Sequence, residues 1–336
     1  MLSSQTSSRL KFSFLISFFW IIANLSSGQT IDNMASFRMV DGNRYIRLNV
    51  DNDYFTATDD YYTAGINLEM VHPLFRKFPL TKILVAPQRY KTRSGISLEQ
   101  NGYTPKSIEH DDILYGDRPF AATLQLKTFS MSVDSMRHQR ITSSLSLGII
   151  GQGAGGYGVQ KALHELIHYT IPRGWQNQIH NDIIINYEFA FEKNLVHLNN
   201  KFLINGMMQA RAGTLNTRLS SGFVMMIGKL NPSITRAFSE SGISAIPTKK
   251  FRFHVYLQPL MNIVGYDATL QGGFFNRDSP YTISQNDLTR ITFQANYGFV
   301  LSFKSIYLEY FKSIISKEFV EGDFHRWGGV RIGVKW

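Results

Sequence analysis

The residues best suited to chemistry lie in one segment, residues 151–182, where a glycine-rich turn precedes a helical pattern over about 157–169. Gln160, His164 and His168 follow one another at intervals of four, so a helix would place all three on one side. Histidine side chains act as bases near neutral pH and also bind metal ions. The spacing therefore predicts a short helix that presents histidines to the element against which it packs.

The same helix also satisfies the pattern His-Glu-x-x-His over residues 164–168. In zinc peptidases, the two histidines of this pattern bind the metal and the glutamate activates water. Here the predicted helix is short, and no downstream segment offers an obvious third ligand. Zinc chemistry at His164 and His168 is therefore kept as one alternative, and histidines that are simply solvated as another.

Composition narrows the chemistry that is possible. The 336 residues include no cysteine, which excludes disulfides, thiolate catalysis and cysteine-bound metals. Hydrophobic residues make up 43% of the chain and its mean hydropathy is −0.14, which excludes a disordered chain. The formal net charge is +10, so the protein is basic.

The N-terminus has the pattern of an export signal. Arg9 and Lys11 precede an apolar run over residues 12–25, and small residues follow at 26–28. The run is shorter than the roughly 20 apolar residues that a membrane-spanning helix needs. We therefore predict a signal peptide over residues 1–28, a mature protein over 29–336 that works outside the cytoplasm, and no membrane-spanning helix.

Most of the chain after residue 40 alternates apolar and polar residues with a period of two. The alternation is clearest over residues 144–149, 183–192, 251–258 and 291–299. Such segments are β-strands with one apolar and one polar face. The pattern therefore predicts an all-β fold.

Two features favour a transmembrane barrel over a secreted β-sandwich. Aromatic residues are frequent near the strand ends, as in the girdles at membrane interfaces. The chain also ends in Trp336, with Val330, Ile332 and Val334 on the same face, which resembles the C-terminal strand of outer-membrane barrels. Since each crossing takes about 9–11 residues, we predict an antiparallel barrel of about 12 strands, with the short helix at the rim or in the lumen.

Four motifs occur in order along the first half of the mature chain. They are Asn-Val-Asp-Asn-Asp-Tyr-Phe at 49–55, Asp-Tyr-Tyr-Thr-Ala-Gly at 60–65, Gly-Asp-Arg-Pro-Phe-Ala-Ala at 116–122, and the block at 151–178 with Gln-x-x-x-His and Gly-Trp-x-x-Gln. The ordered set resembles the outer-membrane lipid A 3′-O-deacylase family. The resemblance implies a 12-stranded outer-membrane barrel that removes the 3′ acyl or acyloxyacyl chain of lipid A and depends on calcium.

The resemblance also assigns roles to individual residues. His164 matches the family's catalytic histidine, the general base that takes a proton from water, and Gln160 would line the site one helical turn earlier. Asn52 and Asp53 match its Asn-Asp pair on the first strand. Because neighbouring residues of a strand face opposite ways, both can serve one site only if the strand ends or bulges there.

The family's calcium and substrate sites map onto a further set of residues. Asp53 would bind Ca²⁺ together with backbone carbonyls around Thr63 and Gly65. Ca²⁺ suits such oxygen ligands and can stabilise an oxyanion. Lys106 and Arg118 are the candidates for binding the phosphates of lipid A, in line with the basic composition. The resemblance implies a membrane-embedded protein, which we expect to be a monomer and not to bind nucleic acid.

One position departs from the family pattern. The residue six places after His164, where the family has an acidic calcium ligand, is Thr170. We expect Glu165, Asp182 or water to complete the calcium shell instead. Because of Thr170, a passive or structural barrel stays an alternative, as does another outer-membrane hydrolase. A phospholipase of the His-x-Ser type is disfavoured, since none of the nine histidines has a serine two residues later.

Overall fold

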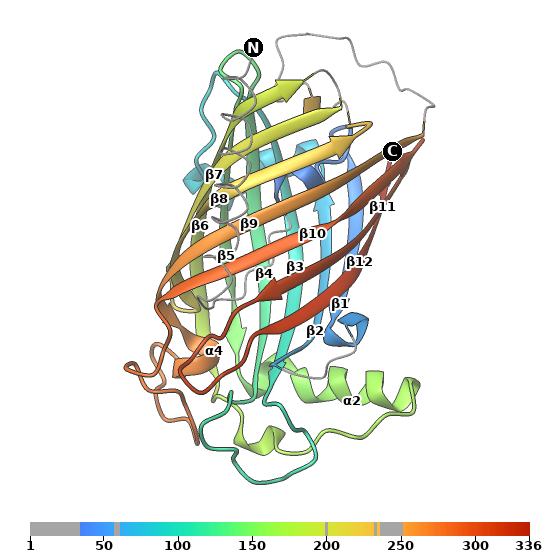
Figure 1. The fold of residues 1–336 in the computed structure, drawn as a ribbon. Coiled ribbons are helices and arrows are strands. Elements are labelled where there is room, and N and C mark those ends of the chain that lie inside the picture. Colours follow the sequence, from blue (N-terminus) through green and yellow to red (C-terminus); the bar gives the residue numbers. More distant parts are fainter. Residues whose placement is uncertain (1–33, 57–60, 199–200, 232–233, 236–250) are drawn as a thin grey trace, which may run out of the picture.

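The fold is a closed antiparallel β-barrel, seen in Figure 1 as a ring of tilted strands. The computed structural model describes residues 34–56, 61–198, 201–231, 234–235 and 251–336. Within them, twelve strands pair in sequence order, and the first strand pairs with the last to close the ring. The predicted all-β barrel is confirmed. The predicted signal peptide at residues 1–28 lies outside the described residues.

The strands are β1 (Tyr45–Asn52), β2 (Tyr61–Val71), β3 (Lys91–Thr104), β4 (Ala121–Asp134), β5 (Gln139–Ile150), β6 (Asp182–Leu198), β7 (Phe202–Gly213), β8 (Asn216–Gly228), β9 (Arg252–Asp267), β10 (Ile291–Phe303), β11 (Ile306–Ile315) and β12 (His325–Lys335). The helices are α2 (Gly156–Leu166) and α4 (Ala268–Gln271), with 3₁₀ turns η2 (Ser36–Arg38), η3 (Asp53–Thr56), η4 (Pro73–Lys77), η5 (Pro79–Ile83), η6 (Gln152–Ala154) and η7 (Trp175–Asn177). Among the described residues, no helix has the length and apolar character needed to cross a bilayer.

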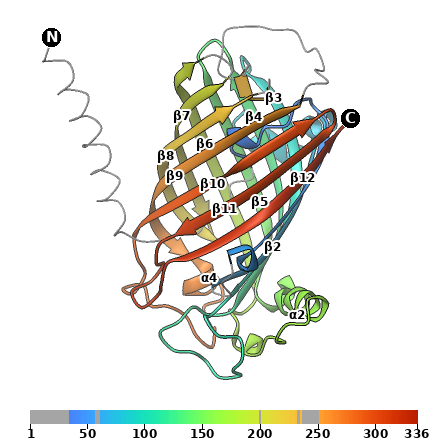
Figure 2. The ribbon, with the colours of Figure 1, turned by 45° about the vertical axis from the view of Figure 1, so that its right-hand side comes forward.

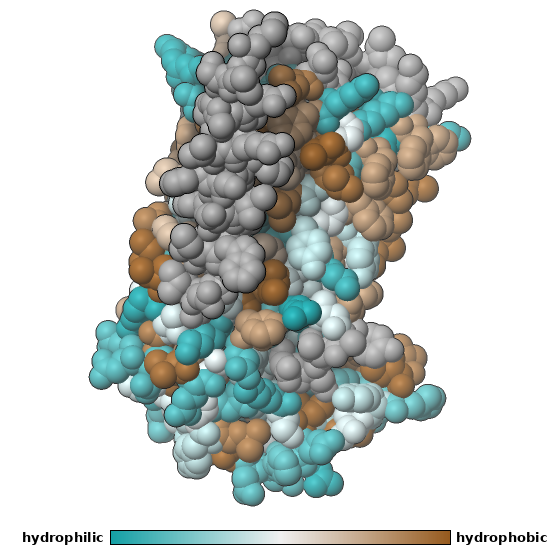
Figure 3. Space-filling model, viewed as in Figure 1, coloured by the Kyte–Doolittle hydropathy of each residue, from teal (hydrophilic) through white to brown (hydrophobic). Residues whose placement is uncertain are grey.

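The barrel turns its apolar residues outward and its polar residues inward. On β6, Ile183 is 58% exposed, whereas Asn186 and Glu188 are buried. On β12, Ile332 is 51% exposed, whereas Arg331 is fully buried. Figure 3 shows the same division on one face, with brown residues over the strands and mostly teal residues over the loops at the lower end. This is the arrangement of a membrane barrel, and it rules out the secreted β-sandwich.

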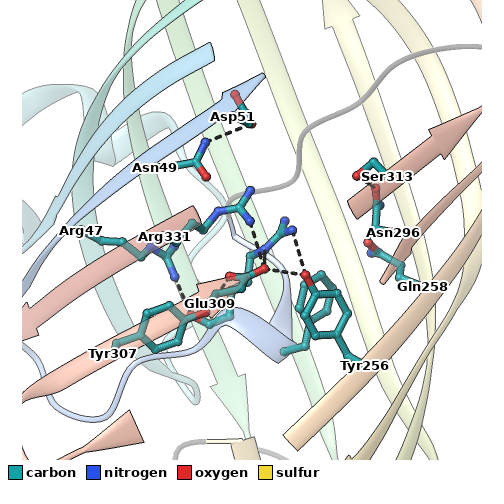
Figure 4. Close-up of polar contacts among 12 residues, drawn as sticks. Arg47, Asn49, Asp51, Tyr256, Gln258, Asn296, Tyr307, Glu309, Ser313 and Arg331 are labelled. Atoms are coloured by element: carbon teal, nitrogen blue, oxygen red, sulfur yellow. Dashed lines mark hydrogen bonds and ion pairs between the residues drawn. The ribbon is translucent and has the colours of Figure 1, made fainter. Parts of the chain in front are cut away.

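Charged residues in the lumen are held in ion pairs. Glu309 accepts hydrogen bonds from Arg38 and Arg331 at 2.9 Å each, from Tyr256 at 2.5 Å and from Tyr307 at 2.8 Å. Figure 4 shows this group within the barrel. Further pairs are Arg47–Glu69, Lys127–Glu99 and Arg140–Glu192, which are buried, and Arg211–Glu188, which is largely buried. Such pairing is what allows charges to lie inside a protein.

A segment at the N-terminal side of β1 fills part of the lumen, which the sequence pattern did not indicate. Residues 34–40 are all buried. Phe37 stacks on Tyr256 with ring centroids 4.0 Å apart, and Arg38 pairs with Glu309. The segment leads into the Tyr45 end of β1. A lumen filled in this way does not suit a porin.

The Glu309 cluster predicts a large loss of stability when the carboxylate is removed. Glu309→Gln leaves the guanidinium groups of Arg38 and Arg331 buried without their counter-charge, which costs about 3–5 kcal/mol. The unfolding midpoint in urea, followed by heat-modifiable migration on gels, should fall accordingly. As the control, Glu165→Gln breaks only the exposed pair with Lys161 and should change stability by less than about 0.5 kcal/mol. Equal midpoints for the two variants would contradict the role of the cluster.

Candidate active site between helix α2 and the barrel wall

Helix α2 lies against the outer side of the barrel at its rim, as Figure 2 shows. A small cavity of about 10 Å³ separates the helix from the wall, and Ile66, Gln100 and Gln160 are among its lining residues. Ile66 is on the exposed face of β2. On β3, the neighbours of Gln100, Glu99 and Asn101, are buried on the luminal side. The helix therefore covers the lipid-facing side of β2 and β3 and does not enter the lumen.

The close approach of α2 to the wall depends on glycine. Gly155 precedes the helix with a φ of 73°, a left-handed conformation that glycine adopts without strain. A Cβ on Gly156 would lie 2.5 Å from Cβ of Ala122 and 2.6 Å from the ring of Trp175. No larger residue fits at position 156 without moving the helix, so the sequence fixes how closely α2 approaches β4.

The helix ends three residues earlier than the sequence pattern predicted. Its last residue is Leu166, and His168 has a left-handed φ of 55°. Gln160 and His164 are buried on the side that faces the wall, whereas His168 is exposed. The expectation that all three share one face is therefore wrong for His168, because the backbone leaves the helix before reaching it.

The geometry does not support the zinc alternative. The pattern needs both histidines on one helical face, and His168 lies beyond the helix. Glu165 points to solvent, where it pairs with Lys161 at 3.8 Å. No group of three or more His, Cys, Asp and Glu side chains that could hold a metal occurs among the described residues. Within this part of the chain, zinc has no prepared ligand set.

A chain of hydrogen bonds joins the strand ends to the helix. Asn52 donates its side-chain amide to the carbonyl oxygen of Thr63. Gln160 donates to Oγ1 of Thr63 at 2.8 Å, and its own Oε1 accepts from Nε1 of Trp175 at 2.7 Å. All four residues are buried. The structure therefore brings together three of the residues that the sequence assigned to the site: Asn52, Thr63 and Gln160.

Asn52 and Asp53 can face the same region because the strand ends between them. β1 stops at Asn52, and Asp53 begins the 3₁₀ turn η3. Both side chains are buried. The pairing of β2 with β3 is irregular between Tyr62 and Ala64, so the strict alternation is broken on the neighbouring strand as well. This agrees with the expectation that a strand end or a bulge lies at this point.

Gly65 lies where no side chain could fit. A Cβ at this position would be 1.8 Å from the hydroxyl of Tyr62 and 2.1 Å from Oδ1 of Asp51. Those two groups are hydrogen-bonded to each other on the luminal side, at 2.8 Å. After the irregularity in β2, Thr63 and Ala64 both line the cavity beside α2, whereas Gly65 lies against the luminal groups.

His164 is oriented by a backbone carbonyl. The side chain is 4% exposed, and its Nδ1 lies 2.6 Å from the carbonyl oxygen of Thr170. Because a carbonyl oxygen can only accept a hydrogen bond, Nδ1 carries the proton when this bond forms. Nε2 then holds the basic lone pair. The ring of Tyr169 packs edge-on against the imidazole, with centroids 5.1 Å apart.

Thr170 thus contributes to the site through its backbone carbonyl and not through its side chain. The departure from the family pattern concerns an acidic side chain, but the contact with His164 is made by the backbone. The expected substitutes for the acidic ligand are engaged elsewhere. Glu165 is exposed, and Asp182 accepts hydrogen bonds from the backbone N–H groups of Ile183, Phe275 and Asn276.

The two candidate phosphate-binding residues have contacts away from α2. Arg118 is buried, pairs with Glu318 and donates to Oγ1 of Thr269 at 2.6 Å. Lys106 pairs with Asp323 at 2.5 Å on the surface. Its hydrogen bond to that carboxylate holds the pKa of Lys106 above its ordinary value. The described contacts of both side chains therefore run to luminal and loop residues rather than to the helix.

The apolar outer face and the charged lumen define a transmembrane barrel of the outer-membrane type, with a covered histidine at its rim. The chain belongs to the LpxR family: the model described as "Outer membrane protein LpxR" matches residues 14–336. The family expected from the four motifs is therefore confirmed, and with it the class of the enzyme, an outer-membrane lipid A 3′-O-deacylase.

The chain is also similar to solved structures, of which LpxR from Salmonella typhimurium shares the architecture. LpxR from Salmonella typhimurium matches with a TM-score of 0.70 and 19% identity, over 87% of this chain and 100% of that chain. The β domain of the Bordetella autotransporter BrkA matches with a TM-score of 0.45 and 7% identity, over 88% of this chain and 99% of that chain. No curated protein sequence matches the chain.

The close packing of α2 against the barrel wall predicts that alanine substitutions at Gly156 and Gly158 have different effects on proteolysis. Gly156→Ala places a methyl group 2.5 Å from Cβ of Ala122, so the helix must shift away from the wall. Trypsin should then cleave after Lys161 several times faster in the folded barrel. Gly158→Ala is the matched control, because a Cβ there meets no atom within 4 Å and alanine favours the helix. Equal cleavage rates for the two variants would show that the contact does not position α2.

Proposed function

We propose that the chain hydrolyses the ester that links the 3′ acyl or acyloxyacyl chain to lipid A, with His164 as the general base that activates water. The observation that supports this most strongly is the contact between Nδ1 of His164 and the carbonyl oxygen of Thr170. It orients the imidazole and assigns the proton to Nδ1, so Nε2 is the atom that can accept a proton from water. In this mechanism no serine or cysteine nucleophile is needed.

Gln160 and Trp175 serve as positioning residues in this proposal. Gln160 spans from the indole N–H of Trp175 to the hydroxyl of Thr63, so it ties the middle of α2 to β2. His164 follows one helical turn later on the same buried side. The two hydrogen bonds therefore restrict how far the imidazole can move from the barrel wall, which keeps the base near the reacting ester.

We propose that Ca²⁺ binds at the end of β1, held by Asp53 with backbone carbonyls around Thr63 and Gly65. The donors fit a hard cation, because the carboxylate of Asp53 and the carbonyl of Thr63 are oxygen ligands, and Asp53 directly follows the last residue of β1. The amide of Asn52 already contacts that carbonyl, and a half-turn of the amide would turn its oxygen toward the same place. When bound, the ion would stabilise the negative charge that develops on the ester oxygen.

The position of the site fits a substrate that arrives from the membrane. The cavity beside α2 includes Ile66, a residue of the lipid-facing wall. A lipid in the outer leaflet can therefore reach the helix without entering the lumen, which residues 34–40 partly fill. Lipid A has its acyl chains in that leaflet. We also propose that the barrel acts on lipid A as a monomer.

The proposed base predicts that two histidines of the same segment behave differently. His164→Ala should lower the release of the 3′ acyl chain by about 10²–10⁴-fold, because the base is lost. His168→Ala should retain full activity, since this side chain is exposed and lies beyond the helix. Mass spectrometry of lipid A from cells that express each variant measures how much 3′ acyl chain that variant releases. Equal loss of activity in the two variants would favour the zinc alternative, and unchanged lipid A with the wild-type chain would refute the activity.

The proposed metal predicts a specific response to chelators. EGTA should abolish deacylation by the purified barrel and added Ca²⁺ should restore it, because oxygen ligands hold the ion. A zinc-selective chelator should have no effect. Asp53→Asn should raise the Ca²⁺ concentration needed for half-maximal activity, while Asp323→Asn, an exposed carboxylate paired with Lys106, should not. Full activity of the wild-type barrel in EGTA would contradict the proposal.

A further inference from the structure

Large apolar side chains are exposed at the end of helix α2. Leu166 is 77% exposed, and Ile167, Tyr169 and Ile171 are also exposed. We call residues 166–171 the apolar lip. In Figure 1, α2 projects sideways from the rim, and Figure 3 shows brown residues at its outer end. Large apolar side chains that are exposed close together usually contact a membrane or another protein.

Leu166, the last residue of α2, belongs to the apolar face of an amphipathic helix. Val159, Leu163 and Leu166 lie at intervals of four and three, so they share a face. Lys161 and Glu165, also four apart, form an exposed ion pair on the opposite face. This division is typical of helices that lie in the interface of a bilayer with the apolar face toward the hydrocarbon.

The apolar face of α2 continues into the membrane-facing wall of the barrel. Val159 of the helix and Ile66 of β2 line the same small cavity. Below Ile66, the exposed residues Leu68 and Leu98 carry the apolar surface along β2 and β3. The wall at this point is the surface that contacts lipid, so the continuity identifies the occupant of the helix face as the acyl chains of the outer leaflet.

We propose that the apolar lip inserts into the hydrocarbon of the outer leaflet and guides acyl chains to the junction between α2 and the wall. The guiding role rests on the proposed function, because it delivers the ester of a membrane lipid to His164. The insertion itself does not depend on that function. Arg173, two residues after the lip, is exposed and lies 3.9 Å from the carboxylate of Asp111.

The absence of cysteine makes the insertion directly measurable. A single cysteine introduced by Leu166→Cys can be labelled with an environment-sensitive fluorophore in the full-length barrel, reconstituted in phosphatidylcholine vesicles. Glu165→Cys is the matched control, one residue away on the polar face. Quenching by a nitroxide on the lipid chains should be several-fold stronger for the label at position 166, and quenching by aqueous iodide several-fold weaker. Equal accessibility of both labels to iodide would overturn the insertion.

The guiding role can be tested by placing charged residues in the apolar lip. Leu166→Glu combined with Ile167→Glu should raise KM for vesicle-embedded lipid A at least about tenfold, with kcat unchanged, because each carboxylate opposes entry into hydrocarbon. Lipid A dispersed in detergent should restore the wild-type KM. An unchanged KM in vesicles would refute the guiding role. If the wild-type chain cleaved no lipid A, the proposed function would fail, and the labelling experiment would still decide whether the lip inserts.

Discussion

Hydrocarbon offers no hydrogen-bond partner to a backbone N–H or C=O group, and the rest of this structure follows from that constraint. Strands can cross a membrane only if every one of them is paired on both sides. The pairing of β1 with β12, from Tyr45 opposite Lys335 to Asn52 opposite Gly328, closes the ladder and leaves no edge. Closure then divides the residues of each strand between lipid and lumen, which explains why a membrane protein has a mean hydropathy of only −0.14.

The same closure determines where chemistry can take place. Polar residues that point inward neutralise one another, as Glu309 does with Arg38 and Arg331, and residues 34–40 occupy part of the remaining space. The histidine is instead held outside the wall, where the strands end and α2 covers them. At a strand end, consecutive residues are freed from alternation, so Asn52 and Asp53 can both serve one site. A lipid that diffuses in the outer leaflet reaches this position directly.

The sequence predicted the features that arise from local pattern. The period of two predicted the strands and the barrel, and the interval between Gln160 and His164 predicted a shared helical face, which the structure confirms. Features that depend on backbone groups or distant contacts could not be predicted. The end of the helix before His168 and the carbonyl of Thr170 beside His164 have no side-chain signature. The buried pair of Arg118 with Glu318 joins residues 200 positions apart, so its motif suggested a free cation.

We infer that an oxygen-ligated cation and the histidine base meet at the junction between the barrel wall and α2. Crystals of the purified barrel grown with Sr²⁺, which resembles Ca²⁺ in its preference for oxygen ligands, would locate the ion by anomalous scattering. We predict the strongest peak beside the carboxylate of Asp53 at the end of β1, next to the carbonyl of Thr63. A peak found only among luminal carboxylates such as Glu99 and Glu188, or no peak at all, would contradict the account.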